Sequence, residues 1–344
     1  MTFIEFQAKY EHKPVTELSN SALEMPLVSV CIQTYKHGAF IQECINSILN
    51  QQTSFVFEIL LSDDASTDGT KEICVEYAEK HPDKIRLFLH QRENNIAIGG
   101  NPTGRFSMMY NMHMAKGRYI ATCEGDDYWT DPHKLQKQFE VLESEPEVML
   151  STTNLKVLNQ HGDLSEFFNQ AKTFPNELSS VSDFFGDKRI NIFAYCTFMF
   201  RKEVAEKCMT QEAFPSIPFG DWCLVYTAVS MGRIHFLNKN TAIYRIHDTS
   251  LMRSQDSKTH LLNLLDLDNF ASQLLPTPYS EKKRNGTFWY HDQLSYTFAE
   301  EGNYSKAIGH FFKGLMIKPV RTPFKSYISH LRNLGYYWKK GLTS

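Results

Sequence analysis

The feature that most constrains the fold is a regular alternation of apolar runs and amphipathic stretches that begins at residue 26. A β-branched run over 26–35 is followed by a segment, 38–51, whose apolar residues recur at the three- and four-residue spacing of one helical face. Further strands are expected at 57–64, 85–91 and 118–127, separated by helices at 66–81 and 102–117. Such a pattern predicts an α/β fold of the Rossmann-like kind. Its mostly parallel sheet would be flanked by helices and would bind ligands at the carboxyl ends of its strands.

After residue 133 the alternation is less regular: a helix is expected to start at Asp221, two separate strand-like segments follow at 233–239 and 241–250, and from about residue 255 the strand signals stop. Residues 298–319 have the spacing of small, aromatic and proline residues found in a single tetratricopeptide-like helix pair. We therefore expect a C-terminal helical appendage. The predicted organisation is an N-terminal extension over 1–25, the α/β domain over 26–254 and a helical region over 255–344.

Composition excludes several classes of protein. The formal net charge of −3 gives no global electrostatic reason to expect nucleic acid as a partner. The seven cysteines include no CxxC pair, which argues against a disulfide framework and a zinc site. The start carries acids where a signal peptide needs apolar residues, and the longest apolar run, 192–200, is far shorter than the roughly 20 residues of a membrane span. These features predict a cytoplasmic protein without a transmembrane anchor.

Polar clusters fall at the ends of the predicted strands. They cover 33–38, 62–70, 124–129, 219–222 and 244–250. Each cluster alone is compatible with turns and helix caps, the 62–70 loop above all. Because carboxyl ends of parallel strands meet at one edge of a sheet, the clusters together predict a binding site.

The order of these clusters over residues 26–250 resembles that of family 2 glycosyltransferases of the GT-A fold. The motifs that carry the resemblance are PLVSVCIQTYKHGAFIQECINSILNQ, EILLSDDASTDGT, EGDDYWTDPHKL, GDW and YRIHDTS. The resemblance implies a nucleotide-sugar donor, with UDP as the common nucleotide. It places Tyr35 and Asp64 against the base and ribose, with Gln33 and Asp63 nearby.

The acidic motif EGDD corresponds to the family's metal motif. A hard divalent cation, Mn²⁺ or Mg²⁺, held there would neutralise the charge that develops on the leaving UDP. We expect Asp127 to be the direct metal ligand and Asp126 to contact the sugar or ribose, while Glu124 stands where the family has its first aspartate. The alternative is that Asp126 and Asp127 only form a turn before Trp129 and Pro132.

The aspartate of GDW, Asp221, matches the family's catalytic base, and one base suits an inverting single displacement. The family pattern usually has two acids there, whereas this chain has Gly220. Capping of the helix is the alternative role for Asp221. His247 matches a histidine that supplies the metal or diphosphate in several GT-A enzymes; it could equally be a structural histidine, with Arg245 as the diphosphate contact.

Two other classes use a similar sheet. Nucleotidyltransferases favour a glycine-rich basic loop after the first strand, which residues 33–40 lack. A non-catalytic nucleotide-sugar or carbohydrate-binding protein would be expected to have lost Asp127 or Asp221, and both are present. The resemblance implies a glycan or lipid-linked acceptor in bacterial surface polysaccharide synthesis, such as capsule or lipopolysaccharide.

The segment from Lys318 to the end holds six Lys or Arg residues, no acid and several aromatic residues. Such a mixture suits peripheral contact with an anionic membrane surface, here the inner face of the cell membrane, although a solvated helical end would have the same composition.

Overall fold

The computed structural model describes residues 1–18, 25–166, 178–179, 194–247, 256–317 and 335. The chain divides into two compact units. The first comprises 1–184 with 189–249, and the second comprises 185–188 with 250–344. Each unit is described by itself below.

The first unit is built on a mixed sheet, whose described strands follow the order β1-β4-β3-β2-β7-β12-β9-β13-β11, with β10 beside β9 and β8 beside β13. The strands are β1 Thr16–Leu18, β2 Val28–Thr34, β3 Phe57–Asp63, β4 Ile85–Leu89, β7 Tyr119–Glu124, β8 Tyr128–Trp129, β9 Val148–Leu158, β10 Leu164–Glu166, β11 Leu178–Ser179, β12 Met199–Arg201 and β13 Arg233–Arg245. A separate hairpin pairs β5 Ala97–Ile98 with β6 Asn101–Pro102.

Strand direction brings the site residues to one edge of the sheet. Strands β4, β3, β2 and β7 are mutually parallel, and β9 is parallel to β13. The short β12 lies between the two groups and is antiparallel to both β7 and β9, so all six parallel strands run in the same direction. Their carboxyl ends therefore share one edge, where open α/β sheets bind ligands.

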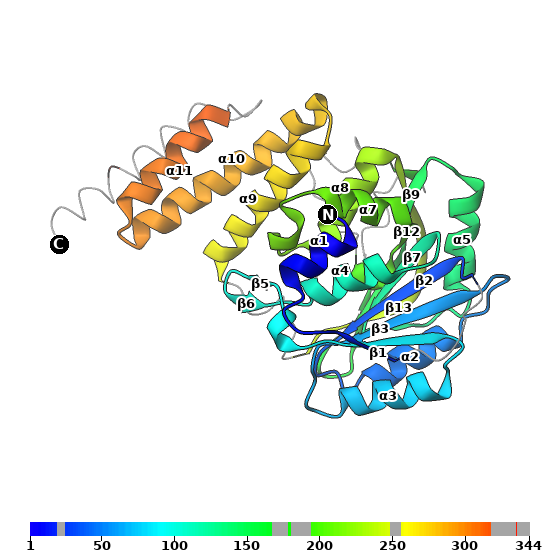
Figure 1. Cartoon of the computed structure of the whole chain (residues 1–344). Coiled ribbons are helices and arrows are strands. Elements are labelled where there is room, and N and C mark those ends of the chain that lie inside the picture. The colour runs from blue at the N-terminus through cyan, green and yellow to red at the C-terminus, as the bar shows by residue number, and fades with distance from the viewer. Residues whose placement is uncertain (19–24, 167–177, 180–193, 248–255, 318–334, 336–344) are drawn as a thin grey trace. The chain divides into compact units, whose positions relative to one another are not determined.

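Helices cover both faces of this sheet. They are α1 Phe3–Tyr10, α2 Ile41–Leu49, α3 Thr70–Lys80, α4 Arg105–Met114, α5 Lys134–Ser144, α7 Lys202–Thr210 and α8 Gly220–Met231, with short 3₁₀ turns η1 Arg92–Asn94, η3 Tyr195–Thr197 and η4 Phe214–Ser216. Figure 1 shows α2 and α3 on one face of the sheet and α4 on the other. Fully buried β2 residues, Val28, Val30 and Ile32, join the core formed with α2 and α3, and each such burial stabilises the fold by about 1.5–3 kcal/mol.

The N-terminal segment belongs to this unit. Strand β1 pairs with β4 at the sheet edge, and Phe6 of α1 is fully buried, with its ring 5.1 Å from that of Phe106.

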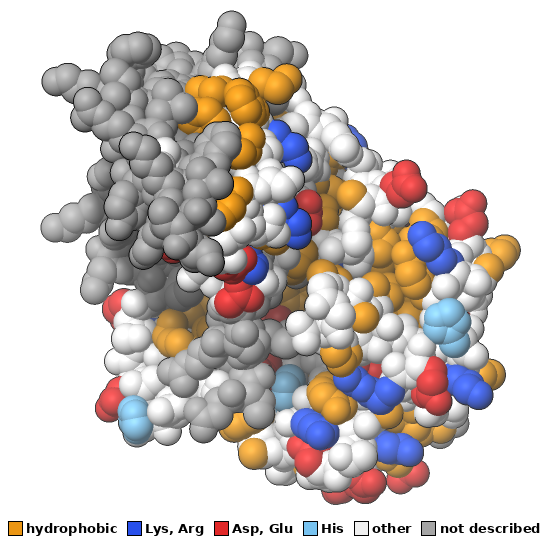
Figure 2. All heavy atoms as spheres, turned by 90° about the vertical axis from the view of Figure 1, so that its left-hand side faces the viewer, with side chains coloured by type: hydrophobic (Ala, Val, Ile, Leu, Met, Phe, Trp, Pro, Cys, Tyr) orange, Lys and Arg blue, Asp and Glu red, His pale blue; other side chains and the backbone are white. Residues whose placement is uncertain are grey.

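On the face in Figure 2, basic and acidic side chains are interspersed rather than separated by sign.

The predicted fold class is confirmed, with three local differences. Helix α4 begins at Arg105 rather than Pro102, because Asn101 and Pro102 pair with β5. The two strands expected around 233–239 and 241–250 form one strand, β13, in which shifts of register beside β9 accommodate the polar residues after Leu237. Helix α8 begins at Gly220, one residue before the predicted start.

The second unit is helical, as predicted for the C-terminal region. It comprises α9 Ser257–Leu274, α10 Thr277–Glu300 and α11 Tyr304–Ile317. The core of this unit includes residues from all three helices, among them Leu265 of α9, Leu294 of α10 and Ala307 of α11. Gly302, with φ of 74°, supplies the left-handed residue that ends α10 and lets the chain reverse into α11.

The basic, aromatic segment from Lys318 lies outside the described residues, apart from Gly335. Among the helices that the structure describes, none combines the length and apolar content needed to cross a bilayer.

Candidate active site

The site begins where β2 and β3 end side by side. Lys36 and Ala65, which follow these strands, have φ of 56° and 54°, a left-handed conformation that is uncommon for residues other than glycine. Such backbone strain persists only where surrounding contacts impose it, and it concentrates at functional sites.

Hydrogen bonds between the two loops impose this conformation. The Asp64 N–H donates to the Thr34 carbonyl at 3.0 Å, and the Lys36 N–H donates to Ser66 Oγ at 2.9 Å. Asp63 is buried and accepts from the Ser66 N–H at 3.0 Å, and burial raises its pKa. Asp63, one of the predicted nucleotide contacts, therefore stabilises the loop that follows β3 through a buried hydrogen bond.

Tyr35 and Asp64 lie at the mouth of the two loops, next to Arg92 of η1. The Arg92 guanidinium carbon lies 4.0 Å from the centre of the Tyr35 ring, and Arg92 forms an ion pair with Asp64. Asn95 Nδ2 donates to the same carboxylate oxygen at 2.8 Å. Burial raises the pKa of Asp64 to about 6, although the charge of Arg92 opposes the shift.

Arg92 is a site residue that sequence reasoning missed. Its one signal is position, because it follows β4, the next strand of the parallel group. No pattern in the sequence indicates that the Arg92 guanidinium lies over the Tyr35 ring.

The end of β7 forms the second part of the site with the end of β13. Asp126 accepts a hydrogen bond from His247, with 2.9 Å between Oδ2 and Nε2, and His37 Nε2 lies 3.9 Å from the same oxygen. One ligand atom from each of these three residues lies within 4.8 Å of the others. A carboxylate and two imidazoles within this distance form a donor set that could hold a divalent cation.

The protonation of this set suits a cation. Burial lowers the pKa of His37, despite the opposing charge of Asp126, so its imidazole is neutral and able to act as a ligand. Burial of Asp126 opposes ionisation, but the pKa of Asp126 is lowered overall, chiefly by the hydrogen bond with His247. His37 is the second residue that sequence reasoning missed, although it lies in the predicted cluster 33–38.

Asp127 lies apart from these imidazoles. It is fully buried, its Oδ1 accepts from the Arg245 N–H at 2.9 Å, and its Oδ2 has no partner among the described residues. Burial and the charge of Asp126 raise its pKa, and burial with the neighbouring Asp127 carboxyl likewise raises that of Glu124. Two such close carboxyls disfavour double ionisation.

The Arg245 side chain is held by groups of the first unit. It forms an ion pair with Glu43 and donates to the Asp126 carbonyl at 2.8 Å. Its guanidinium carbon also lies 4.6 Å from the centre of the Tyr128 ring. These contacts join α2 to the acidic motif.

Asp221 lies in the first turn of α8 and is half-buried. Burial raises its pKa, and the Trp222 N–H and the charge of Arg105 oppose the shift. Phe219 is the residue at the N-cap position, and Asp221 lies two residues later, so Asp221 is not the N-cap residue of α8. The charge of Asp221 also raises the pKa of Glu124, so the start of α8 and the end of β7 interact electrostatically.

Unpartnered polar atoms gather at this edge. Among the described residues, nine buried side-chain polar atoms lack a hydrogen-bond partner, and five of them belong to residues at the ends of β2, β3 and β7. They are Gln33 Nε2, Thr34 Oγ1, His37 Nδ1, Asp63 Oδ1 and Asp127 Oδ2. Unpaired buried groups cost free energy, so their concentration indicates a surface arranged for a polar ligand.

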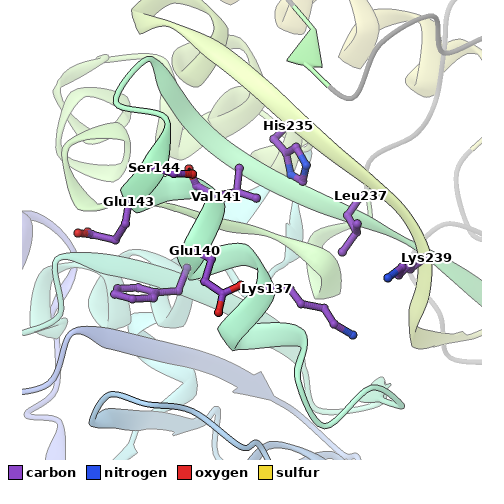
Figure 3. Close-up of a pocket in the computed structure, with 9 residues that line it drawn as sticks. Lys137, Glu140, Val141, Glu143, Ser144, His235, Leu237 and Lys239 are labelled. Carbon is purple, nitrogen blue, oxygen red and sulfur yellow. The ribbon is translucent and has the colours of Figure 1, made fainter.

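A separate groove of about 720 Å³ lies between α5 and the first half of β13. Figure 3 shows His235, Leu237 and Lys239 on the strand and Lys137, Glu140 and Val141 on the helix. None of the predicted site residues lines it.

Comparison with known proteins identifies the family of this chain. The profile described as glycosyl transferase family 2 matches residues 29–209. An uncharacterized Mycobacterium bovis protein, Mb1547, is 31% identical over 232 residues, which are 67% of this chain and 61% of that protein. The putative teichuronic acid biosynthesis glycosyltransferase TuaG of Bacillus subtilis is 31% identical over 137 residues, 40% of this chain and 50% of that one.

Solved structures share the fold at low identity. S. aureus TarS residues 1–349 in complex with UDP-GlcNAc have a TM-score of 0.51 and 17% identity, over 81% of this chain and 89% of that chain. The mannosyltransferase PcManGT of Pyrobaculum calidifontis in complex with GDP-Man and Mn²⁺ has a TM-score of 0.53 and 15% identity, over 98% and 94%. The profile match covers more than half of the sequence, and the chain belongs to glycosyl transferase family 2.

Proposed function

We propose that this chain is an inverting, metal-dependent glycosyltransferase that transfers a sugar from a UDP-sugar to a hydroxyl group of a glycan or lipid-linked acceptor. The observation that carries the proposal is the convergence of His37, Asp126 and His247 within 4.8 Å at the same sheet edge as Tyr35 and Asp64. This arrangement fits a nucleoside diphosphate, because a cation held by the three side chains could bind the diphosphate while the aromatic ring at the same edge stacks on the base.

The donor would be recognised by two kinds of contact. Tyr35 is 36% exposed, so a base could stack on the part of its ring that Arg92 leaves open. The Asp64 carboxylate can accept hydrogen bonds from a ring N–H or a ribose hydroxyl. Nucleotide sugars bound to TarS and PcManGT support a donor of this class.

We propose Asp126, His37 and His247 as the residues that would hold the cation, which departs from the sequence-based assignment of Asp127. A bound divalent cation would supply positive charge against the diphosphate that leaves with the nucleotide. Imidazole ligands favour Mn²⁺ over Mg²⁺. Asp127 would instead fix the end of β13 through the Arg245 N–H, and so orient His247 two residues later.

Asp221 would be the general base. Its carboxylate would accept the proton of the acceptor hydroxyl, so that the oxygen attacks the anomeric carbon and the sugar–phosphate bond breaks on the opposite side. One displacement of this kind inverts the configuration of that carbon. The name of TuaG supports a surface-polysaccharide acceptor.

The test compares Asp126→Asn with the matched control Asp131→Asn, because Asp131 is an acid that pairs with Lys137 and does not belong to the three-residue group. UDP release is measured with UDP-glucose and UDP-GlcNAc, with Mn²⁺ or with EDTA. We expect wild type and the control to release UDP only with Mn²⁺, and Asp126→Asn to lose at least about tenfold of this rate. Binding of UDP-sugar without release would instead indicate a non-catalytic binder, and equal release in EDTA would refute the metal assignment.

A further inference from the structure

A buried arginine on the face of the sheet opposite α2 and α3 holds the turn that carries Asp221. Arg105, the first residue of α4, is only 4% exposed. Its Nη1 donates to the Phe214 carbonyl at 2.9 Å and its Nη2 to the Ile217 carbonyl at 2.6 Å, with the Pro218 carbonyl at 3.5 Å. Three carbonyls from the turn that leads into α8 therefore converge on one guanidinium.

Gly220 is part of the same contact. A Cβ atom at this position would lie 2.6 Å from Arg105 Nη2 and 2.7 Å from Cζ, which is closer than real atoms approach. The guanidinium thus occupies the space in which any larger residue before Asp221 would place its side chain. This packing accounts for a glycine where the family pattern usually has a second acid.

The described hydrogen-bond partners of Arg105 are uncharged. In the described part of the chain, no carboxylate lies within salt-bridge distance of it, and its partners are neutral carbonyls. A buried cation without a counter-ion is costly. Its field reaches Asp221 on α8, which is also faced by Glu124 at the end of β7.

We propose that Arg105 is a positioning residue for the transfer reaction: its guanidinium fixes the turn before α8, on which Asp221 lies, and places a buried positive charge at that turn. The inference rests on the proposed function, because it requires Asp221 to act as the base. Arg105 is buried and is not one of the residues proposed to bind the donor, so its removal should change the rate and its pH dependence but not donor binding.

The experiment measures UDP release from UDP-GlcNAc with Mn²⁺ as a function of pH, together with UDP affinity and melting temperature. The acidic limb is the part of the pH–rate profile in which the rate falls as the pH is lowered. For Arg105→Met we expect this limb to move up by about one pH unit. At pH values below the limb the rate of UDP release should then be about tenfold lower than that of wild type. UDP affinity should be unchanged. Arg105→Lys keeps the charge but not the planar fork, so it should keep the limb near the wild-type position while melting earlier.

Arg201→Met is the matched control. Arg201 is also buried and donates to the carbonyls of Val148 and Leu142, but it lies on β12 next to α5. This variant should lower the melting temperature without moving the limb. If Arg105→Met does not fold, Gly220→Ala makes the test with Arg105 present, because the added methyl group must displace the guanidinium and should move the limb in the same direction.

A limb that stays at the wild-type pH in folded Arg105→Met, or in Gly220→Ala, would overturn the inference and leave Arg105 a structural residue. Asp221→Asn separates this outcome from failure of the proposed function. If Asp221→Asn releases UDP at the wild-type rate, the base assignment itself is wrong. If Asp221→Asn is inactive while the limb does not respond to Arg105, only the role of Arg105 fails.

Discussion

Replacement of Asp64 by asparagine should stabilise the fold at neutral pH while it weakens donor binding. Burial raises the pKa of Asp64 from 3.8 to about 6, so the ionised form is disfavoured in the folded chain. At roughly 1.36 kcal/mol per pH unit this difference corresponds to about 3 kcal/mol. The cost is absent below pH 3.8, grows between 3.8 and about 6, and is complete above 6.

Asparagine resembles the neutral carboxyl group in shape, so Asp64→Asn should avoid this cost. We expect its free energy of unfolding at pH 8 to exceed that of wild type by about 1–3 kcal/mol. At pH 4 the two proteins should be equally stable, because Asp64 is then largely protonated in the folded chain. In this variant Arg92 loses its ion pair with Asp64. Because Arg92 is only half-buried and can reach solvent, the loss of this ion pair should change the free energy of unfolding little.

The assay is urea unfolding followed by intrinsic fluorescence at pH 4 and pH 8, with UDP affinity measured in Mn²⁺ by calorimetry. Loss of a charge-assisted hydrogen bond to the donor should weaken UDP binding by about 10- to 100-fold. Asp131→Asn provides a control of opposite sign: because burial is outweighed by hydrogen bonds to Lys137 and the His133 N–H, its pKa is lowered and its removal should destabilise at pH 8. Equal destabilisation by Asp64→Asn at both pH values would refute the reasoning.

Three further outcomes are expected. Asp221→Asn should reduce UDP release by about 10²- to 10⁴-fold with UDP affinity and melting temperature near wild type, as measured by a coupled UDP assay and thermal shift; a parallel loss of folding would identify a structural residue. Arg92→Met should leave the Tyr35 face more accessible and raise the pKa of Asp64 further, so that UDP binding measured by calorimetry weakens more at pH 6.5 than at pH 8. Gly302→Ala should destabilise the α10–α11 pair by about 1–2 kcal/mol, because φ of 74° is unfavourable for alanine; an unchanged thermal unfolding curve by circular dichroism would contradict this.

Over residues 26–133 the sequence was sufficient to predict the alternation of the main strands and helices, because each of these elements carries its own period. Val28, Val30 and Ile32 alternate toward the core as a strand requires, and Ile41 to Ile48 follow the spacing of one helical face. The single strand β13 was not predictable in this way. Its continuity after Leu237 depends on shifts of register beside β9, which is a property of the pairing and not of the segment.

The clusters at the strand ends were also predictable, because parallel strands place their carboxyl ends together whatever follows them. The contacts within the clusters were not. Arg92 meets Asp64 across 28 residues, and Arg105 meets Phe214 across 109. Asp126 and Asp127 are adjacent and chemically equal in the sequence, yet only one of them lies beside the imidazoles.

The distribution of strain explains why this edge of the sheet can serve a function. Left-handed Lys36 and Ala65, the raised pKa of Asp64 and the unpartnered Oδ2 of Asp127 all reduce the stability of the first unit at the same edge. A ligand that supplies hydrogen bonds and positive charge there would relieve several of these costs together, so its binding would be coupled to stability. The melting temperature of wild type should therefore rise with UDP and Mn²⁺ added together by more than the sum of the two separate shifts, and Asp126→Asn should remove this excess. Additive shifts in wild type would mean that cation and nucleotide occupy independent sites.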